Sequence, residues 1–411
     1  RDRCYHLKSL LIKVNVIKLM KRLIKPHGTT TLQVPLAKTP RESDKVNNLP
    51  TLILNDPALS NVVMIGSGYF NPLEGFMSFE EAKSVCQTFR LSDGLFWPVP
   101  VINLVQSKPD FESGQKIALL DPTRDNKPCI ALMDVSDIET LSDKDIDEMI
   151  LRIFGTNDSS HPGVKKFRTL GNFLISGKLE IFDLGSFPRD YPDTFRTAQQ
   201  IREHIVNSGW DKVVAFQTRN PMHRAHEVLC KLAVDRIGAD GLIIHMLLGK
   251  LKDGDIPAGV RDDCIKTMVD CYFNEIPVLV SGYGFDMLYA GPREALLHAI
   301  IRQNMGATHL IVGRDHAGVG SFYGAFEAQE IFDELQVSND LSIKIFNADH
   351  TAYSKKLGRV VMLNEVDGHV PNDFVTLSGT NLRALLGKGE MPPKEIVRPE
   401  VAEILMNFYQ S

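Results

Sequence analysis

Residues 212–227 read Lys212-Val213-Val214-Ala215-Phe216-Gln217-Thr218-Arg219-Asn220-Pro221-Met222-His223-Arg224-Ala225-His226-Glu227. An apolar run of strand type leads into a polar turn, and the residues that follow have the apolar spacing of a helix. A strand that ends at a helix N-terminus makes an anion pocket, because free backbone N–H groups and the helix dipole point toward it. The polar turn 217–220 lies where an anion would be held.

The alternation of strand and helix continues outward from this stretch, from residue 191 to residue 327. Strands are expected at 213–216, 241–248, 278–281 and 308–312, and helices at 195–207, 222–237, 258–273 and 292–304. This order predicts right-handed βαβ units and a parallel sheet. Ligands of such sheets bind outside the carboxyl ends of the strands. Three polar clusters fall there, at 217–226, 249–255 and 313–320.

The flanking parts of the chain have a different pattern. Residues 20–190 contain short β-type runs between turns, with helices expected at 80–89 and 143–154, which predicts a β-rich N-terminal domain. Residues 328–411 predict a small α/β C-terminal domain. Residues 1–19 are basic and amphipathic, and we interpret them as a non-native or disordered extension, with a targeting or membrane-surface helix as the alternative.

The composition narrows the class of protein. The 411 residues carry a formal net charge of −5, which argues against a general nucleic-acid binder. No apolar run approaches the ~18–20 residues that span a bilayer, so no membrane partner is expected. Six cysteines are scattered without a Cys-x-x-Cys pair, which is typical of a reducing compartment and predicts a cytoplasmic protein.

Two histidines and a glycine-rich loop are the candidate functional features. His223 and His226 share one face of the first helical turn, and there they could donate hydrogen bonds to a phosphate chain or merely cap and pack. Arg219 suits bidentate capture of a tetrahedral oxyanion. The loop Gly313–Gly320 can turn backbone N–H groups inward around a phosphate, although it lacks the Walker pattern. Zinc is a weaker reading of the histidine pair, because His-Glu-x-x-His is absent.

These motifs resemble those of ATP sulfurylases, the sulfate adenylyltransferase family. The resemblance rests on Gln217–His226, Gly313–Gly320, Pro72–Met77, Ala290–Ala295 and Ser378–Arg383, and it runs from about Met20 to the C-terminus. Ala225 stands at the glycine position of the wider His-x-Gly-His pattern of nucleotidyltransferases, as it does in the sulfurylases. The closest likeness is to the short, dimeric bacterial form without an APS kinase domain, found in sulfur oxidisers that run the reaction toward ATP.

The resemblance implies a fold and a reaction. The fold is a Rossmann-like nucleotidyltransferase sheet, preceded by a PUA-like domain and followed by a small C-terminal domain. Sulfate attacks the α-phosphorus of ATP, pyrophosphate leaves, and adenylyl sulfate (APS) forms in a reversible reaction. Mg²⁺ arrives with ATP or pyrophosphate. No protein-bound zinc is expected, because Ser321-Phe322-Tyr323 follows Gly320 without a cysteine.

The resemblance also implies roles for individual residues. Sulfate is expected at Gln217, Arg219 and the backbone of Ala317. The nucleotide is expected at Gln217, Thr218, Arg219, Asn220, Gly313, Arg314, Asp315 and His316. The catalytic residues are expected to be Thr218, Arg219, Asn220, His223 and His226, with the two histidines facing the leaving pyrophosphate.

Two other functions stay open from the residues. One is an adenylyltransferase with a different acceptor, such as nicotinamide mononucleotide. The other is a non-catalytic RNA-binding or regulatory protein that uses the β-rich domain, although the acidic balance argues against RNA.

Overall fold

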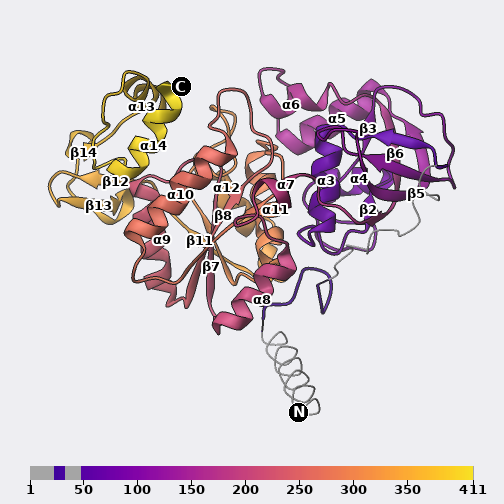
Figure 1. Cartoon of the computed structure of the whole chain (residues 1–411). Helices are drawn as coiled ribbons and strands as arrows, with labels where there is room; N and C mark the ends of the chain where they lie inside the picture. Colours follow the sequence, from indigo (N-terminus) through magenta and orange to yellow (C-terminus); the bar gives the residue numbers. More distant parts are fainter. Residues whose placement is uncertain (1–22, 33–47, 411) are drawn as a thin grey trace, which may run out of the picture.

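The computed structural model describes residues 23–32 and 48–410, and the predicted extension at residues 1–19 lies outside them. Three β-sheets organise the described chain, with the five-stranded sheet in the middle of the molecule (Figure 1). None of the helices in these ranges is long and apolar enough to cross a membrane.

The first unit is built on a six-stranded sheet in the order β1-β4-β5-β6-β2, with β3 also paired to β6. Its strands are β1 (Thr51–Ile53), β2 (Gly75–Phe76), β3 (Leu104–Val105), β4 (Lys116–Leu120), β5 (Cys129–Thr140) and β6 (Phe173–Ile181), and its helices are α3 (Asp56–Gly66), α4 (Phe79–Thr88), α5 (Asp143–Phe154) and α6 (Pro162–Phe167). Helix α3 was not predicted, because its β-branched core residues imitate a strand. The Asn55 side chain caps it by accepting the Ala58 N–H at 3.0 Å.

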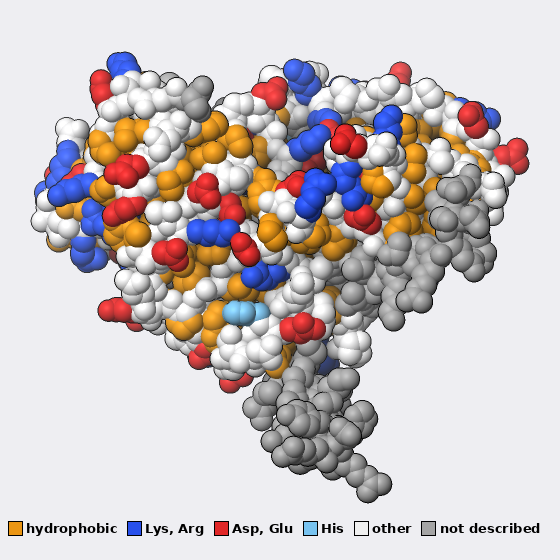
Figure 2. Space-filling model, in the orientation of Figure 1, with side chains coloured by type: hydrophobic (Ala, Val, Ile, Leu, Met, Phe, Trp, Pro, Cys, Tyr) orange, Lys and Arg blue, Asp and Glu red, His pale blue; other side chains and the backbone are white. Residues whose placement is uncertain are grey.

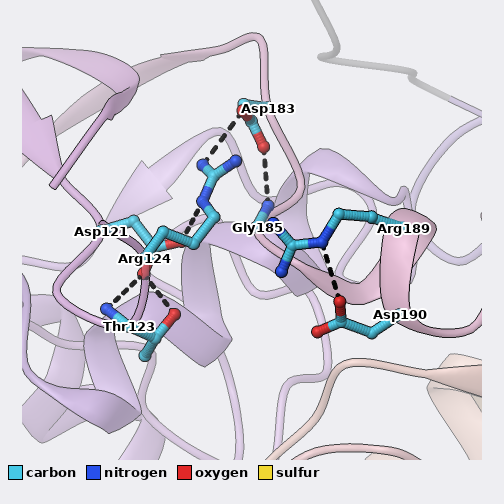
Figure 3. Close-up of polar contacts among 7 residues, drawn as sticks. All are labelled: Asp121, Thr123, Arg124, Asp183, Gly185, Arg189 and Asp190. Atoms are coloured by element: carbon cyan, nitrogen blue, oxygen red, sulfur yellow. Dashed lines mark hydrogen bonds and ion pairs between the residues drawn. The ribbon is translucent and has the colours of Figure 1, made fainter. Parts of the chain in front are cut away.

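A network of carboxylates fixes the place where the chain leaves the first sheet (Figure 3). The fully buried Asp121 carboxylate accepts hydrogen bonds from Thr123 N at 2.9 Å and from Arg124 Nε at 2.8 Å. Arg124 Nη2 also lies 3.0 Å from Asp183 Oδ2, and Asp183 Oδ1 accepts the Gly185 N–H at 2.8 Å. The β4–β5 turn is therefore tied to the segment that carries the chain into the second unit.

The second unit is a five-stranded parallel sheet in the order β11-β10-β7-β8-β9. Its strands are β7 (Val213–Thr218), β8 (Gly241–Leu247), β9 (Val278–Tyr283), β10 (His309–Val312) and β11 (Lys344–Asn347), and its helices are α7 (Phe187–Asp190), α8 (Ala198–Ser208), α9 (Arg224–Ile237), α10 (Ala258–Tyr272), α11 (Gly291–Asn304) and α12 (Glu327–Glu334). Helices cover both faces of the sheet, so its central strands are almost wholly apolar and buried.

Strand β11 corrects the predicted start of the C-terminal domain. The prediction assigned everything after residue 327 to that domain. However, β11 pairs with β10 in parallel, with Leu310 opposite Ile345, so it belongs to the central sheet. Helix α12 packs against α11 of the same unit.

The third unit is small and follows Asn347. It contains the antiparallel sheet β13-β12-β14, formed by β12 (Thr351–Ser354), β13 (Arg359–Met362) and β14 (Phe374–Val375), and the helices α13 (Gly379–Gly387) and α14 (Pro399–Gln410). Helix α14 packs against α10, and Arg224 N at the start of α9 donates to Ile396 O at 2.9 Å. The last part of the chain thus contacts the helix that follows the polar turn.

The junction between the first two units is polar at the surface. Asp56 forms ion pairs with Lys166 at 3.1 Å and with Lys250 at 2.7 Å, which joins α3, α6 and the loop after β8. A cavity of about 390 Å³ is lined in part by Asp56 and Lys250. Figure 2 shows acidic and basic side chains interspersed on this face of the molecule.

Candidate active site

The candidate site lies at the point where the strand order of the parallel sheet reverses. From β7 the chain proceeds to β8 and β9 on one side, whereas β10 and β11 lie on the other. The polar turn 217–220 lies at the end of β7, and the glycine-rich loop 313–320 follows the neighbouring strand β10. The two loops touch, because Arg219 Nη2 donates to Gly318 O at 2.9 Å across 99 residues of sequence. Such a reversal is where parallel sheets bind their ligands.

The Thr218 hydroxyl holds the first turn in shape. It donates to Asn220 O at 2.8 Å and accepts the Asn220 N–H at 3.1 Å, and its side chain is buried. Both hydrogen bonds of the Thr218 hydroxyl therefore close the turn. Asn220 is exposed at the tip, while the Gln217 amide lies by the hydroxyl of Tyr283.

Arg219 is held on two sides and keeps one donor free. Its guanidinium lies over the ring of Tyr289, with Cζ 4.9 Å from the ring centroid. Nη2 is bound to Gly318 O, whereas the buried Nη1 finds no hydrogen-bond partner among the described residues. A buried donor without a partner costs about 1–3 kcal/mol, so this nitrogen is suited to an incoming anion.

The two histidines lie at the start of α9 and do not cap it. His223 occupies the N-cap position, but its side chain accepts no hydrogen bond from the first turn of the helix. Its ring stacks on that of His226, which also packs against Phe216 at a centroid distance of 5.3 Å. The capping interpretation is therefore wrong for His223. Within the described chain, Ile396 O takes the N–H of Arg224, which leaves those of Ala225 and His226 in the first turn for a ligand.

Burial keeps both imidazoles neutral. Desolvation, with a smaller contribution from His350, lowers the pKa of His223 to about 4. Desolvation, followed by the neighbouring His223, lowers the pKa of His226 well below its usual value. In the ligand-free protein at neutral pH, each ring therefore offers one N–H donor and carries no positive charge.

The loop after β10 has the backbone conformation of an anion nest. Asp315 and Ala317 have positive φ angles of 55° and 56°, which non-glycine residues rarely adopt. The Asp315 N–H donates to Ala325 O and the Gly318 N–H to Asp315 O. In the described chain the N–H groups of Arg314, His316 and Ala317 have no protein acceptor. Free N–H groups gathered in a tight loop in this way bind phosphate or sulfate oxygens.

A buried polar face of α11 supports this loop and was missed from the sequence. Glu294, His298 and Arg302 recur every four residues and are all fully buried. His298 Nδ1 lies 3.0 Å from His316 Nε2, which links the helix to the loop. Burial raises the pKa of Glu294 to about 7, and burial, with Arg302 and Arg219 nearby, lowers that of His316 to about 3. The four-residue spacing of these three ionisable residues along the helix was the available signal.

The predicted polar cluster at 249–255 reaches the site only indirectly. Lys252 N donates to the Tyr289 hydroxyl at 2.8 Å, and that hydroxyl donates to Asp255 Oδ2 at 3.1 Å. The loop 249–255 therefore binds the hydroxyl of Tyr289, whose ring contacts Arg219. Tyr289 was not singled out from the sequence, because nothing in its local spacing indicates a contact with Arg219.

The side chains that could ligate a metal do not gather in the part of the chain that the structure describes. Over residues 23–32 and 48–410, no group of three or more histidine, cysteine, aspartate or glutamate side chains could hold an ion. The donor set of the two loops is instead rich in N–H groups, which bind anions.

Comparisons with known proteins bear on the whole chain. Residues 192–408 match a family model described as ATP-sulfurylase, and residues 24–184 match one described as a PUA-like domain. The sulfate adenylyltransferase of Allochromatium vinosum is 52% identical over 393 residues, which cover 95% of this chain and 99% of that protein. The sulfate adenylyltransferase of Alcanivorax borkumensis is 52% identical over 397 residues, with the same coverage.

A more distant solved structure has a similar fold. The hexameric APS kinase from Thiobacillus denitrificans superposes with a TM-score of 0.73 at 21% sequence identity. The superposition covers 94% of this chain and 68% of that one.

Proposed function

Because the chain belongs to the ATP-sulfurylase family and is a sulfate adenylyltransferase, we propose that a sulfate oxygen attacks the α-phosphorus of ATP directly. The new P–O bond to sulfate forms as the bond to pyrophosphate breaks, which gives adenylyl sulfate without a covalent enzyme intermediate. Sulfate is already an anion, so no general base is needed. Catalysis then depends on positioning the two anions and stabilising the departing charge.

Sulfate is held by Gln217, Arg219 and the backbone N–H of Ala317 in this proposal. The observation that carries it is the buried Nη1 of Arg219, which has no acceptor within the part of the chain that the structure describes. The Ala317 N–H on the facing loop is equally without a protein acceptor there. Two unsatisfied donors on adjoining loops suit a tetrahedral dianion.

The nucleotide is held along both loops. We assign Gln217, Thr218, Arg219 and Asn220 to its phosphates on one side, and Gly313, Arg314, Asp315 and His316 on the other. The free N–H groups of Arg314 and His316 support this assignment. Thr218 contributes by fixing the turn, since its hydroxyl is engaged with Asn220.

Pyrophosphate leaves toward the start of α9. His223 and His226 donate hydrogen bonds to it, and the free N–H groups and partial positive charge of the helix terminus act in the same direction. Its negative charge would raise the pKa of both rings, so that they gain positive charge as it binds. Mg²⁺ enters with ATP or pyrophosphate and neutralises part of the phosphate charge.

The reaction is reversible, and its direction follows the concentrations of its reactants. We propose that the enzyme runs toward ATP in a cell that oxidises sulfur, and that it acts as a cytoplasmic homodimer. A pyrophosphate-dependent ATP synthesis assay with adenylyl sulfate, run beside the forward assay, compares the two directions.

The decisive test uses pure protein with Mg-ATP and molybdate, a sulfate analogue whose mixed anhydride hydrolyses. We expect molybdate-dependent formation of AMP and pyrophosphate. Folded protein without this activity at high Mg-ATP would refute the proposal. An adenylyltransferase with another acceptor would instead exchange pyrophosphate into ATP without any dependence on sulfate.

A further inference from the structure

Tyr289 has a backbone conformation that its side chain does not favour. It lies between β9 and α11 with a φ of 63°, in the left-handed region where bulky residues are rare, and its side chain is buried. Such a conformation persists only where the surrounding structure imposes it, and it is typical of functional sites.

The Glu294 side chain holds the backbone of Tyr289 in this conformation. One of its carboxylate oxygens accepts the Leu288 N–H at 3.1 Å, and the other accepts the Ala290 N–H at 3.0 Å. The fully buried carboxylate thus binds the residues on both sides of Tyr289. This clamp fixes the direction in which the tyrosine ring leaves the backbone.

Contacts from two further parts of the chain fix the ring and the turn. The hydroxyl is bound by Lys252 N and Asp255, and the carbonyl lies 3.0 Å from His161 Nε2 of the first unit. The next turn is tied to the glycine-rich loop, because Gly291 N donates to Ala317 O at 3.1 Å. Tyr289 is therefore held rigidly beside both loops of the site.

Arg219 meets Tyr289 through a cation–π contact, with Cζ 4.9 Å from the ring centroid, and this contact uses no hydrogen-bond donor of the guanidinium. Stacking on an aromatic ring consumes none of the in-plane N–H donors, whereas a carboxylate partner would take two of them and neutralise the charge. No ion pair of Arg219 with a carboxylate occurs among the residues described. The arginine consequently keeps both its charge and its free Nη1 for an anion.

We propose that Tyr289 is a positioning residue that aims Arg219 at sulfate. Its ring holds the guanidinium beside Gly318 O without neutralising the positive charge. The inference rests on the proposed function, in which Arg219 holds sulfate. It assigns Tyr289 a role in sulfate recognition that acts only through Arg219.

A double-mutant cycle tests the inference with purified full-length variants. Tyr289→Leu removes the ring, and Tyr289→Phe removes only the hydroxyl. We expect Tyr289→Leu to lower kcat/KM for sulfate on the order of tenfold with little change in KM for Mg-ATP. Tyr289→Phe, which keeps the ring, should retain most of the wild-type kcat/KM for sulfate. In the Arg219→Ala background, Tyr289→Leu should cause no further loss, because its only route of action has been removed.

A matched control is the cation–π pair of Tyr272 and Arg398, which lies outside the two loops of the site. Arg398 Cζ is 4.0 Å from the centroid of the Tyr272 ring. Tyr272→Leu should leave kcat/KM for sulfate unchanged, while thermal melts verify that every variant folds. Equal losses from Tyr289→Leu in the wild-type and Arg219→Ala backgrounds would overturn the inference alone. Near-normal activity of Arg219→Ala would refute the proposed role of Arg219, and the inference with it.

Discussion

The imidazole rings of His223 and His226 are stacked face to face, with centroids 3.7 Å apart and planes inclined by 24°. The two rings contact each other through their faces, so the ring nitrogens at the edges remain accessible to other hydrogen-bond partners. His226 Nδ1, for example, is buried and has no hydrogen-bond partner among the described residues. Stacked neutral rings at a helix N-terminus form a surface of N–H donors that suits a polyphosphate.

Replacing either ring should slow the chemical step. We expect His223→Ala and His226→Ala each to lower kcat by at least ~10²-fold, the usual effect of removing one group that stabilises developing charge. The loss should occur in both directions of the reaction, measured by molybdate-dependent ATP breakdown and by ATP synthesis from adenylyl sulfate. His204→Ala on α8 is the control and should keep its activity. Wild-type turnover in either active-site variant would exclude the assigned role.

Replacing Arg219 should lower the catalytic efficiency with sulfate while the protein stays folded. Arg219→Ala should lower kcat/KM for sulfate by at least ~10²-fold, because the site loses its charged donor. Arg236→Ala is the matched control, since Arg236 forms an exposed ion pair with Glu365 at 2.6 Å. Initial rates over a series of sulfate concentrations compare the two variants. An unchanged sulfate dependence in Arg219→Ala would show that another group holds the anion.

The packing of α14 should depend on Arg398. Glu227 is almost fully buried, and although burial by itself would raise its pKa, hydrogen bonds from Arg398 and Lys231 lower it. Arg398 Nε and Nη2 donate to its carboxylate at 2.8 and 3.0 Å. Arg398→Met leaves only Lys231 on this buried charge and should lower the free energy of unfolding by about 1–3 kcal/mol.

Urea unfolding measures this difference against Arg236→Met. That control breaks a surface pair of similar geometry and should cost no more than ~1 kcal/mol. Equal midpoints for the two variants would mean that the burial of Glu227 does not matter to stability.

Stability should fall as the pH is lowered from 6.5 toward 4. Burial is the main cause that lowers the pKa of five histidines near the site, which are His223, His226, His245, His298 and His316. In this window they stay neutral in the folded state but take up protons in the unfolded chain, so acid favours unfolding. Two buried carboxyl groups with pKa values raised to about 7, Asp286 and Glu294, act in the opposite direction.

Thermal melts at pH 7.5, 6.5, 5.5 and 4.5 measure the net effect of these two groups on stability. We expect the contribution of the histidines to exceed that of the two carboxyl groups. One excess proton in the unfolded state corresponds to about 1.4 kcal/mol per pH unit. His298→Gln removes one of these groups and should flatten the slope. A melting temperature that rises on acidification would show that the carboxyl groups dominate instead.

The sequence predicts the central sheet well because each strand is an apolar run that ends in polar residues. The family, the PUA-like part and the parallel sheet that follows it are confirmed. Predictions failed where tertiary contacts decide local structure. Helix α3 has strand-like side chains at Val62, Val63 and Ile65, and its capping residue and burial outweigh their preference.

The polar turn and the glycine-rich loop could be found as motifs, but their contacts could not. The cation–π contact of Arg219 with Tyr289 joins two loops that no local spacing relates. The role of Glu294 as an acceptor for two backbone N–H groups depends on a turn whose shape only the folded chain defines. The roles of the individual site residues in catalysis remain predictions.

The hydrogen bond between Arg219 and Gly318 joins residues that are 99 positions apart. A break in the backbone anywhere between the end of α9 and the start of β10 would put the two anion-binding loops on separate fragments. Neither fragment could then turn over ATP alone. Activity in a mixture of the two fragments would therefore require them to reassemble with β7 paired to β10. The enzymatic rate would then be proportional to the concentration of reassembled fragment pairs.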